Sequence, residues 1–146
     1  MDEKVSEILK QSQLMNMCSA NEYSPLALAY IGDAVYELII RTLVISIGNA
    51  PVNRYHQETK GFVQARAQAK LYNDVEEILT AREQDIFRRG RNAKSGSVAK
   101  NADIITYRHA TGIETLIGYL YIDGQIERII EIMKYGIQKD REGDKK

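Results

Sequence analysis

The chain has 146 residues, with 20 basic and 20 acidic side chains and therefore no formal net charge. This length suits one domain with a proper core, and the charge balance excludes a global basic field as the source of any nucleic-acid affinity. A single cysteine, Cys18, excludes an internal disulfide and a paired-cysteine metal site. No secretory pattern or membrane-spanning apolar stretch is present, so we expect a cytoplasmic protein with no membrane partner.

Helical periodicity predicts an all-α fold, because only two prolines occur and no stretch alternates as a strand. Thr80 and Glu83 form a capping-box pattern, which indicates the start of a helix that ends at Gly90. The other helices that we expect are a short one up to Leu14 and longer ones over Pro25 to about Ser46, His56 to about Ile78, from just after Asp103 to Tyr121, and Gln125 to about Gln138. We interpret 91–103 as a loop and 139–146 as a charged tail after a single domain over 1–138.

One carboxylate, Asp33, lies in the middle of the apolar helix that begins at Pro25. Because a charge is expensive to bury, an acid on a rigid apolar helix predicts either a paired cation or a bound metal. Helical spacing groups Asp33 with Glu37 and Tyr30 on one side. The opposite side is apolar and comprises Leu28, Ile31, Val35, Leu38 and Ile39.

A second apolar helix carries one carboxylate in the same way, at Glu114. Gly32 and Gly118 lower the helix propensity of the two segments, and close approach of the helices would explain both glycines. If the helices pack, Asp33 and Glu114 could face one pocket and share a hard divalent cation such as Mg²⁺. Spacing alone equally allows two solvent-facing acids on separate amphipathic helices.

Four segments of the chain, taken together with their order along the sequence, resemble one protein family. Residues 29–37, Ala-Tyr-Ile-Gly-Asp-Ala-Val-Tyr-Glu, resemble the signature helix of the ribonuclease III catalytic domain, and residues 113–118 resemble its second acidic helix. Residues 87–94 and 107–112 are similar to the short bacterial branch of that family, Mini-ribonuclease 3. The resemblance extends from about residue 26 to residue 121, which is most of the chain.

The resemblance implies a ribonuclease III-like helical bundle without a separate double-stranded-RNA-binding domain. Asp33 and Glu114 would be the catalytic residues and the Mg²⁺ ligands of an endoribonuclease. Its products would be 5′-phosphate and 3′-hydroxyl ends of double-stranded RNA. Three family positions that carry further acids are Leu26, Ala29 and Thr111 here, so two acidic ligands remain of the expected set. One hydrated Mg²⁺ suits two carboxylates better than a two-metal site does.

Other residues are candidates for contacts around this centre. Glu37, Tyr30 and Tyr107 are expected as outer contacts to the acids, and pairing of Glu37 with a nearby cation is the alternative. Basic side chains gather in the middle of the chain, as contact with RNA phosphates requires. The expected RNA-binding residues are Arg88, Arg89, Arg91, Asn92, Lys94, Lys100 and Arg108. A solvated charged face with an ordinary loop between helices is the alternative.

The family's task implies the partners. Members mature large-subunit ribosomal RNA, which implies the stem of the 23S rRNA precursor as substrate and a ribosomal protein as helper. A double cut needs a homodimer, with the apolar parts of the signature helix as the interface. Two other functions stay open: a catalytically silent module that binds double-stranded RNA during ribosome assembly, and a helical protein-interaction domain with an incidental basic loop.

Overall fold

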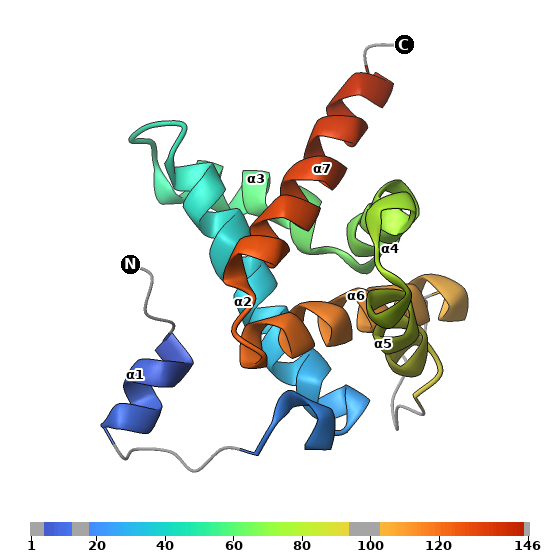
Figure 1. The fold of residues 1–146 in the computed structure, drawn as a ribbon. Helices are drawn as coiled ribbons and strands as arrows, with labels where there is room; N and C mark the ends of the chain where they lie inside the picture. The colour runs from blue at the N-terminus through green and yellow to red at the C-terminus, as the bar shows by residue number, and fades with distance from the viewer. Residues whose placement is uncertain (1–4, 13–17, 94–102, 145–146) are drawn as a thin grey trace.

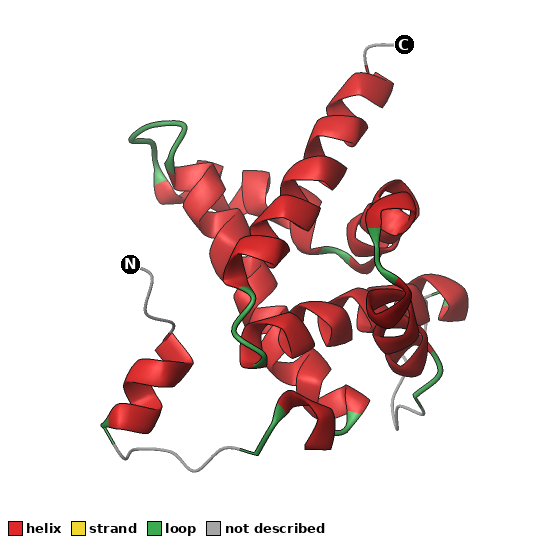
Figure 2. Cartoon of the chain, viewed as in Figure 1, coloured by secondary structure: helices red, strands yellow, loops and turns green. Residues whose placement is uncertain are grey.

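The computed structural model describes residues 5–12, 18–93 and 103–144. The regular elements in these ranges are helices, as Figure 2 shows, so the predicted all-α fold is confirmed. They are α1 (Val5–Gln11), η1 (Ala20–Glu22), α2 (Pro25–Ile45), α3 (Val52–Val63), α4 (Ala65–Val75), η2 (Glu76–Ile78), α5 (Ala81–Arg91), α6 (Ile104–Ile122) and α7 (Ile126–Asp144). Within the described ranges, none of these helices has the length and apolar character that crossing a membrane requires.

Side-chain caps define where the two acid-bearing helices begin. Ser24 Oγ accepts a hydrogen bond from the Ala27 backbone N–H at 3.2 Å, and Pro25 follows at the first helical position of α2. At the start of α6, Asp103 Oδ1 accepts from the Ile105 backbone N–H at 3.0 Å. Each cap satisfies a backbone donor that has no partner inside its helix. The starts of α2 and α6 are therefore fixed by local chemistry.

The two helices α2 and α6 cross in the centre of the molecule with their backbones in contact (Figure 1). A β-carbon on Gly32 would lie 1.8 Å from the carbonyl oxygen of Glu114. Similarly, a β-carbon on Gly118 would lie 1.8 Å from the carbonyl oxygen of Leu28. No side chain fits at either position, so the predicted reason for the two glycines is confirmed.

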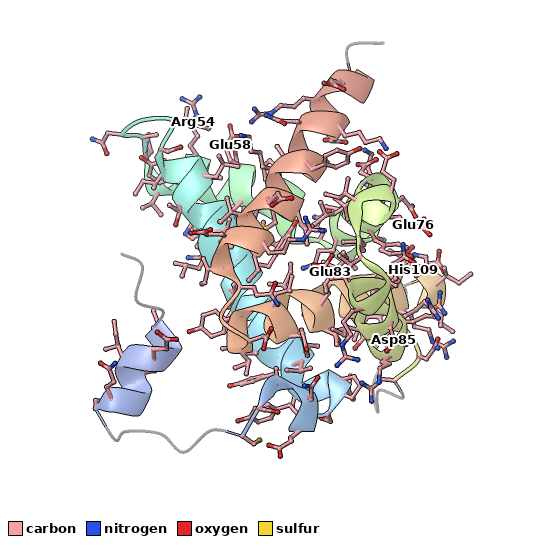
Figure 3. The ribbon with its side chains drawn as sticks, in the orientation of Figure 1. Arg54, Glu58, Glu76, Glu83, Asp85 and His109 are labelled. Carbon is pink, nitrogen blue, oxygen red and sulfur yellow. The ribbon has the colours of Figure 1, made fainter. Side chains whose placement is uncertain are left out.

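Phe87 of α5 connects the crossing helices to α4. Its ring is fully buried and stacks on Tyr72 of α4, with ring centroids 3.6 Å apart. His109 of α6, which is labelled in Figure 3, completes the cluster with an edge contact, and its ring centroid lies 5.8 Å from that of Phe87. A β-carbon on Gly112 would lie 2.6 Å from the Phe87 ring, so α5 also packs closely on α6. These contacts hold α4, α5 and α6 as one body.

A buried ion pair attaches α7 to α5. The Glu83 carboxylate receives hydrogen bonds from Arg128 Nη2 at 2.8 Å and Nε at 2.9 Å, and Glu83 is labelled in Figure 3. Burial acts to raise the pKa of Glu83, but hydrogen bonds from Arg128 and Thr80 outweigh it and lower that pKa. The capping box predicted for Thr80 and Glu83 is present. The same carboxylate therefore both caps α5 and anchors α7.

Two sequence-based predictions of structure are wrong. The helix predicted over 56–78 is broken at Gln64, whose backbone is extended. The Phe62 carbonyl near that break accepts a hydrogen bond from the Tyr36 hydroxyl at 2.6 Å, a contact from another helix. Beyond residue 138, α7 continues to Asp144, because Lys139 pairs with Glu77 at 2.6 Å and Asp140 pairs with Lys70.

The helix crossing leads to a prediction about stability. We expect Gly118→Ala to lower the free energy of unfolding by about 3 kcal/mol or more, because its methyl group would overlap a backbone carbonyl that cannot move aside. The matched control is Gly61→Ala in α3, where a β-carbon has no neighbour within 4 Å. That change should raise stability by up to about 1 kcal/mol through helix propensity. Urea denaturation of both variants tests this, and equal effects would contradict the backbone contact.

Candidate functional site

The backbone contact at Gly32 brings both predicted acids into one open groove. Asp33 follows Gly32 along α2, while Glu114 supplies the carbonyl that Gly32 touches. The groove has a volume of about 630 Å³ and is bounded by α2, α6 and the junction of α3 with α4. Its lining residues are Leu26, Ala29, Tyr30, Ile31, Asp33, Ala34, Glu37, Val63, Ala65, Gln68, Tyr107, Ala110, Thr111 and Glu114. The two acids therefore border a single space.

The groove disfavours the ionised forms of these acids. Burial raises the pKa of Glu114 to about 8, and the nearby negative charge of Asp33 contributes to the rise. Burial also raises the pKa of Asp33, with a further contribution from Glu37. Among the described residues, neither carboxylate takes part in a hydrogen bond or an ion pair. A bound cation would relieve both the desolvation and the repulsion.

The predicted outer contacts lie around the groove in different environments. Glu37 borders it, and its carboxylate pairs with Arg41 at 2.9 Å, which is the alternative that the sequence left open. Tyr30 is 84% exposed at the edge, and Tyr107 is half-buried in the wall formed by α6. A direct role for these three side chains stays a prediction.

The donor set fits one hydrated Mg²⁺. In the described part of the chain, no group of three or more His, Cys, Asp or Glu side chains could hold a metal ion. Two carboxylates facing an open groove remain, which are hard oxygen ligands with space for water beside them. Mg²⁺ usually keeps several waters and binds proteins through one or two carboxylates. Asp33 and Glu114 therefore provide what this ion requires.

The described members of the predicted RNA-binding set lie at the end of α5 and on α6. A β-carbon on Gly90 would lie 2.3 Å from the hydroxyl oxygen of Thr115, so the last turn of α5 packs on the residue that follows Glu114 in α6. Arg88, Arg89 and Asn92 are exposed in or just after that turn, Arg91 is half-buried there, and Arg108 is exposed on α6. Helical spacing puts Arg108 on the side of α6 that carries Gly112 and Thr115 and faces α5. Lys94 and Lys100 lie outside the described residues.

Sequence reasoning missed one residue of the groove, Gln68 of α4. Its side chain is 2% exposed, and Nε2 has no hydrogen-bond partner. A signal was available in the sequence, because Gln68 is in helical register with the buried residues Leu71 and Val75. A polar residue in an apolar register is informative, since buried polar groups are normally hydrogen-bonded.

Comparison with known proteins identifies this arrangement as a ribonuclease III domain, whose family model matches residues 26–125. A crystal structure of a Fusobacterium nucleatum protein has the same fold, with a TM-score of 0.72 and 28% identity over 82% of this chain and 95% of that one. The Mini-ribonuclease 3 of Thermoanaerobacter is 42% identical over 94% of this chain and 97% of its own length. That of Clostridium tetani is 51% identical over 77% of this chain and 76% of its own.

The chain therefore belongs to the Mini-ribonuclease 3 branch of the ribonuclease III family. Both the resemblance stated from four sequence segments and the helical fold that it implied are confirmed. The prediction that the chain is an enzyme of the ribonuclease class is confirmed by the same relatives.

The raised pKa of Glu114 predicts a pH-dependent effect on stability. The carboxyl group titrates near 4.5 when unfolded and near 8 when folded, so its favourable contribution is lost as the pH rises through this interval. In buffer with a chelator, Glu114→Gln should therefore melt at a higher temperature than the parent at pH 8.5, with a smaller difference at pH 5. Thermal unfolding at both pH values tests this. A difference that does not change with pH would contradict the burial of this acid.

Proposed function

We propose that this chain is a Mg²⁺-dependent endoribonuclease that cleaves double-stranded RNA to 5′-phosphate and 3′-hydroxyl ends. The observation that carries the proposal is the pair Asp33 and Glu114 in one groove, with no protein cation among the described residues to neutralise them. A fold that needed these acids only for packing would pair them, as it pairs Glu83 with Arg128. Their unpaired state is typical of a site prepared for a metal ion.

The two acids have different surroundings and different parts in this proposal. Glu114 is half-buried on α6 and holds the ion from the inner wall of the groove, while Asp33 is exposed on α2 and holds it from the rim. The open side next to Asp33 leaves room for a phosphodiester. When bound, Mg²⁺ lowers the pKa of a coordinated water, which supplies the nucleophile at neutral pH. No histidine is needed as a base, and His109 is engaged in the aromatic cluster with Phe87.

The basic residues of α5 and α6 bind the duplex in this proposal. Arg88 and Arg89 are exposed at the end of α5, and Arg108 is exposed on α6. A-form RNA offers phosphates and 2′-hydroxyls along a wide, shallow minor groove, so recognition depends on shape more than on sequence. Arg91, Asn92, Lys94 and Lys100 are assigned to the same contact from their place in the sequence.

The family resemblance extends the proposal to partners. The expected substrate is the stem of the 23S rRNA precursor in the cytoplasm, with a ribosomal protein as helper, and a homodimer cuts both strands. Support for the homodimer comes from α2, where Tyr30, Leu38 and Ile45 are 84%, 66% and 60% exposed. Leu38 and Ile45, two turns apart, lie on one side of the helix and form an apolar stripe that a second copy would cover, and Tyr30 lies beside it at the edge of the groove.

Cleavage of a long RNA duplex tests the catalytic proposal. The parent should cut the duplex with Mg²⁺ and stop when a chelator is added. Asp33→Asn should slow cleavage by at least about 10³-fold, because a metal contributes several kcal/mol to the barrier and each 1.36 kcal/mol is a factor of ten. Cleavage rates of a generic RNA duplex and of the 23S precursor stem are compared with the same enzyme, and the stem should be cut faster. Sedimentation of the same sample measures the mass of the protein, which should be that of a dimer.

The outcomes separate the functions that the sequence left open. Binding without cleavage, in the parent and in Asp33→Asn alike, would contradict the nuclease and favour the silent RNA-binding module. Absence of duplex binding at low salt would favour a protein-interaction domain.

A separate prediction concerns the RNA contact. Arg88→Ala should weaken binding equally for duplexes of different sequence and reduce the slope of log K against log salt by about 1, because one phosphate contact is lost. The matched control is Lys134→Ala, which removes the same charge from an exposed position on α7. Filter binding in chelator at several salt concentrations measures both. Equal slopes for parent and Arg88→Ala would contradict a phosphate contact at this residue.

A further inference from the structure

Gln68 is a buried polar side chain whose donor lacks a partner. It belongs to α4 and is 2% exposed, and its Nε2 atom makes no hydrogen bond. Such a group lowers the stability of a fold, because the N–H donor has lost its hydrogen bonds to water and makes none to the protein. Its neighbours in the same helix, Ala69 and Leu71, are ordinary core residues. A purely structural core would be better served by an apolar side chain at this position.

The position of Gln68 suggests a function for its unpaired amide. Gln68 lines the same groove as Asp33 and Glu114 but comes from a third element, α4. The two carboxylates have no hydrogen-bond donors among the described residues, while the amide has a donor without an acceptor. The α4 wall of the groove therefore carries a free hydrogen-bond donor, and the walls formed by α2 and α6 carry the acceptors.

We propose that Gln68 is a positioning residue for the cation site, whose side-chain Nε2 donates a hydrogen bond to the Glu114 carboxylate when a divalent cation is bound. This inference rests on the proposed function, since it assumes that Asp33 and Glu114 hold the ion. Glu114 is the partner chosen because it is the more buried of the two acids and belongs to the inner wall of the groove. A rotation of the amide about its last torsion, which is soft, brings the donor into use.

A neutral amide suits this task better than a cationic side chain would. Lysine or arginine in the same position would neutralise Glu114 and compete with the metal ion. An amide donor fixes the direction of the carboxylate and leaves its full negative charge available for the cation. Hydrogen bonds of this kind orient the ligands of metal sites, and their loss typically weakens metal affinity or activity about 10- to 100-fold.

The test compares Gln68→Met, which keeps the length and loses the amide, with Gln84→Met as a matched control. Gln84 is on α5, outside the groove, and its amide donates to the backbone carbonyl of Glu76. For each protein, thermal unfolding is followed first in chelator and then against rising Mg²⁺. Cleavage of duplex RNA at saturating Mg²⁺ then gives kcat and KM separately.

We expect Gln68→Met to melt in chelator at the parent's temperature or above it, since an unpaired amide is removed. The Mg²⁺ concentration for half-maximal stabilisation should rise about 10- to 100-fold. At saturating Mg²⁺, any loss should fall on kcat, with KM for RNA unchanged. Gln84→Met should keep the parent's Mg²⁺ response.

Two results would overturn the proposal for Gln68 alone: a Mg²⁺ response identical to that of the parent, or a lower melting temperature in chelator. The second would mean that Gln68 is structural, and Gln68→Leu separates the loss of the amide from poor fit of the longer side chain. If the parent itself neither responds to Mg²⁺ nor cuts RNA, the proposed function fails, and the role of Gln68 fails with it.

Discussion

The contact of two helix backbones at Gly32 and Gly118 is the constraint on which both fold and site depend. Because no side chain separates α2 from α6, the distance between the helices is set by peptide groups, which do not compress. Asp33 follows one glycine, and Glu114 supplies the carbonyl against which that glycine packs. The buried hydroxyl of Thr115, next in the chain, donates to the Thr111 carbonyl at 2.8 Å and lies 3.1 Å from that of Pro25. The separation of the two acids is thus a property of the core.

The groove itself is the part of the molecule that works against stability. Desolvation and mutual repulsion oppose ionisation of Asp33 and Glu114, and Gln68 adds a donor without an acceptor. Among the other described residues, buried polar side chains have partners, as in the ion pair of Glu83 with Arg128. Polar groups that oppose stability at one groove, within a scaffold whose other described buried polar side chains are paired, are expected where a stable fold carries a binding site.

Sequence reasoning succeeded where local chemistry determines the structure. Ser24 with Pro25 predicted the start of α2, and the capping box at Thr80 predicted the start of α5, since both signals act within one helical turn. The helix crossing was predictable because few other causes explain glycines within apolar helices. The four segments, together with their order, were specific enough to identify the family.

The features that could not be predicted from the sequence depend on contacts between residues that are distant along the chain. The break at Gln64 accompanies a hydrogen bond from Tyr36 to Phe62, and the last turns of α7 depend on the pairing of Lys139 with Glu77. Neither partner is recognisable from the neighbouring sequence. Gln68 could be assigned to a buried register, but whether its amide has a partner is decided by three helices together.

The end of α5 and the start of α6 are each closed by groups of their own last or first turn. Asp103 closes the start of α6 with its own carboxylate, which also accepts from the Thr106 hydroxyl at 3.1 Å. On the other side, the backbone N–H of Asn92 donates to the Arg88 carbonyl and closes α5. Asp103 and Asn92 thus close these two helix ends through contacts within a single turn. Because Asp103 acts within the first turn of α6, the residue at which that helix begins is set locally, and the helical register that carries Glu114 follows from it.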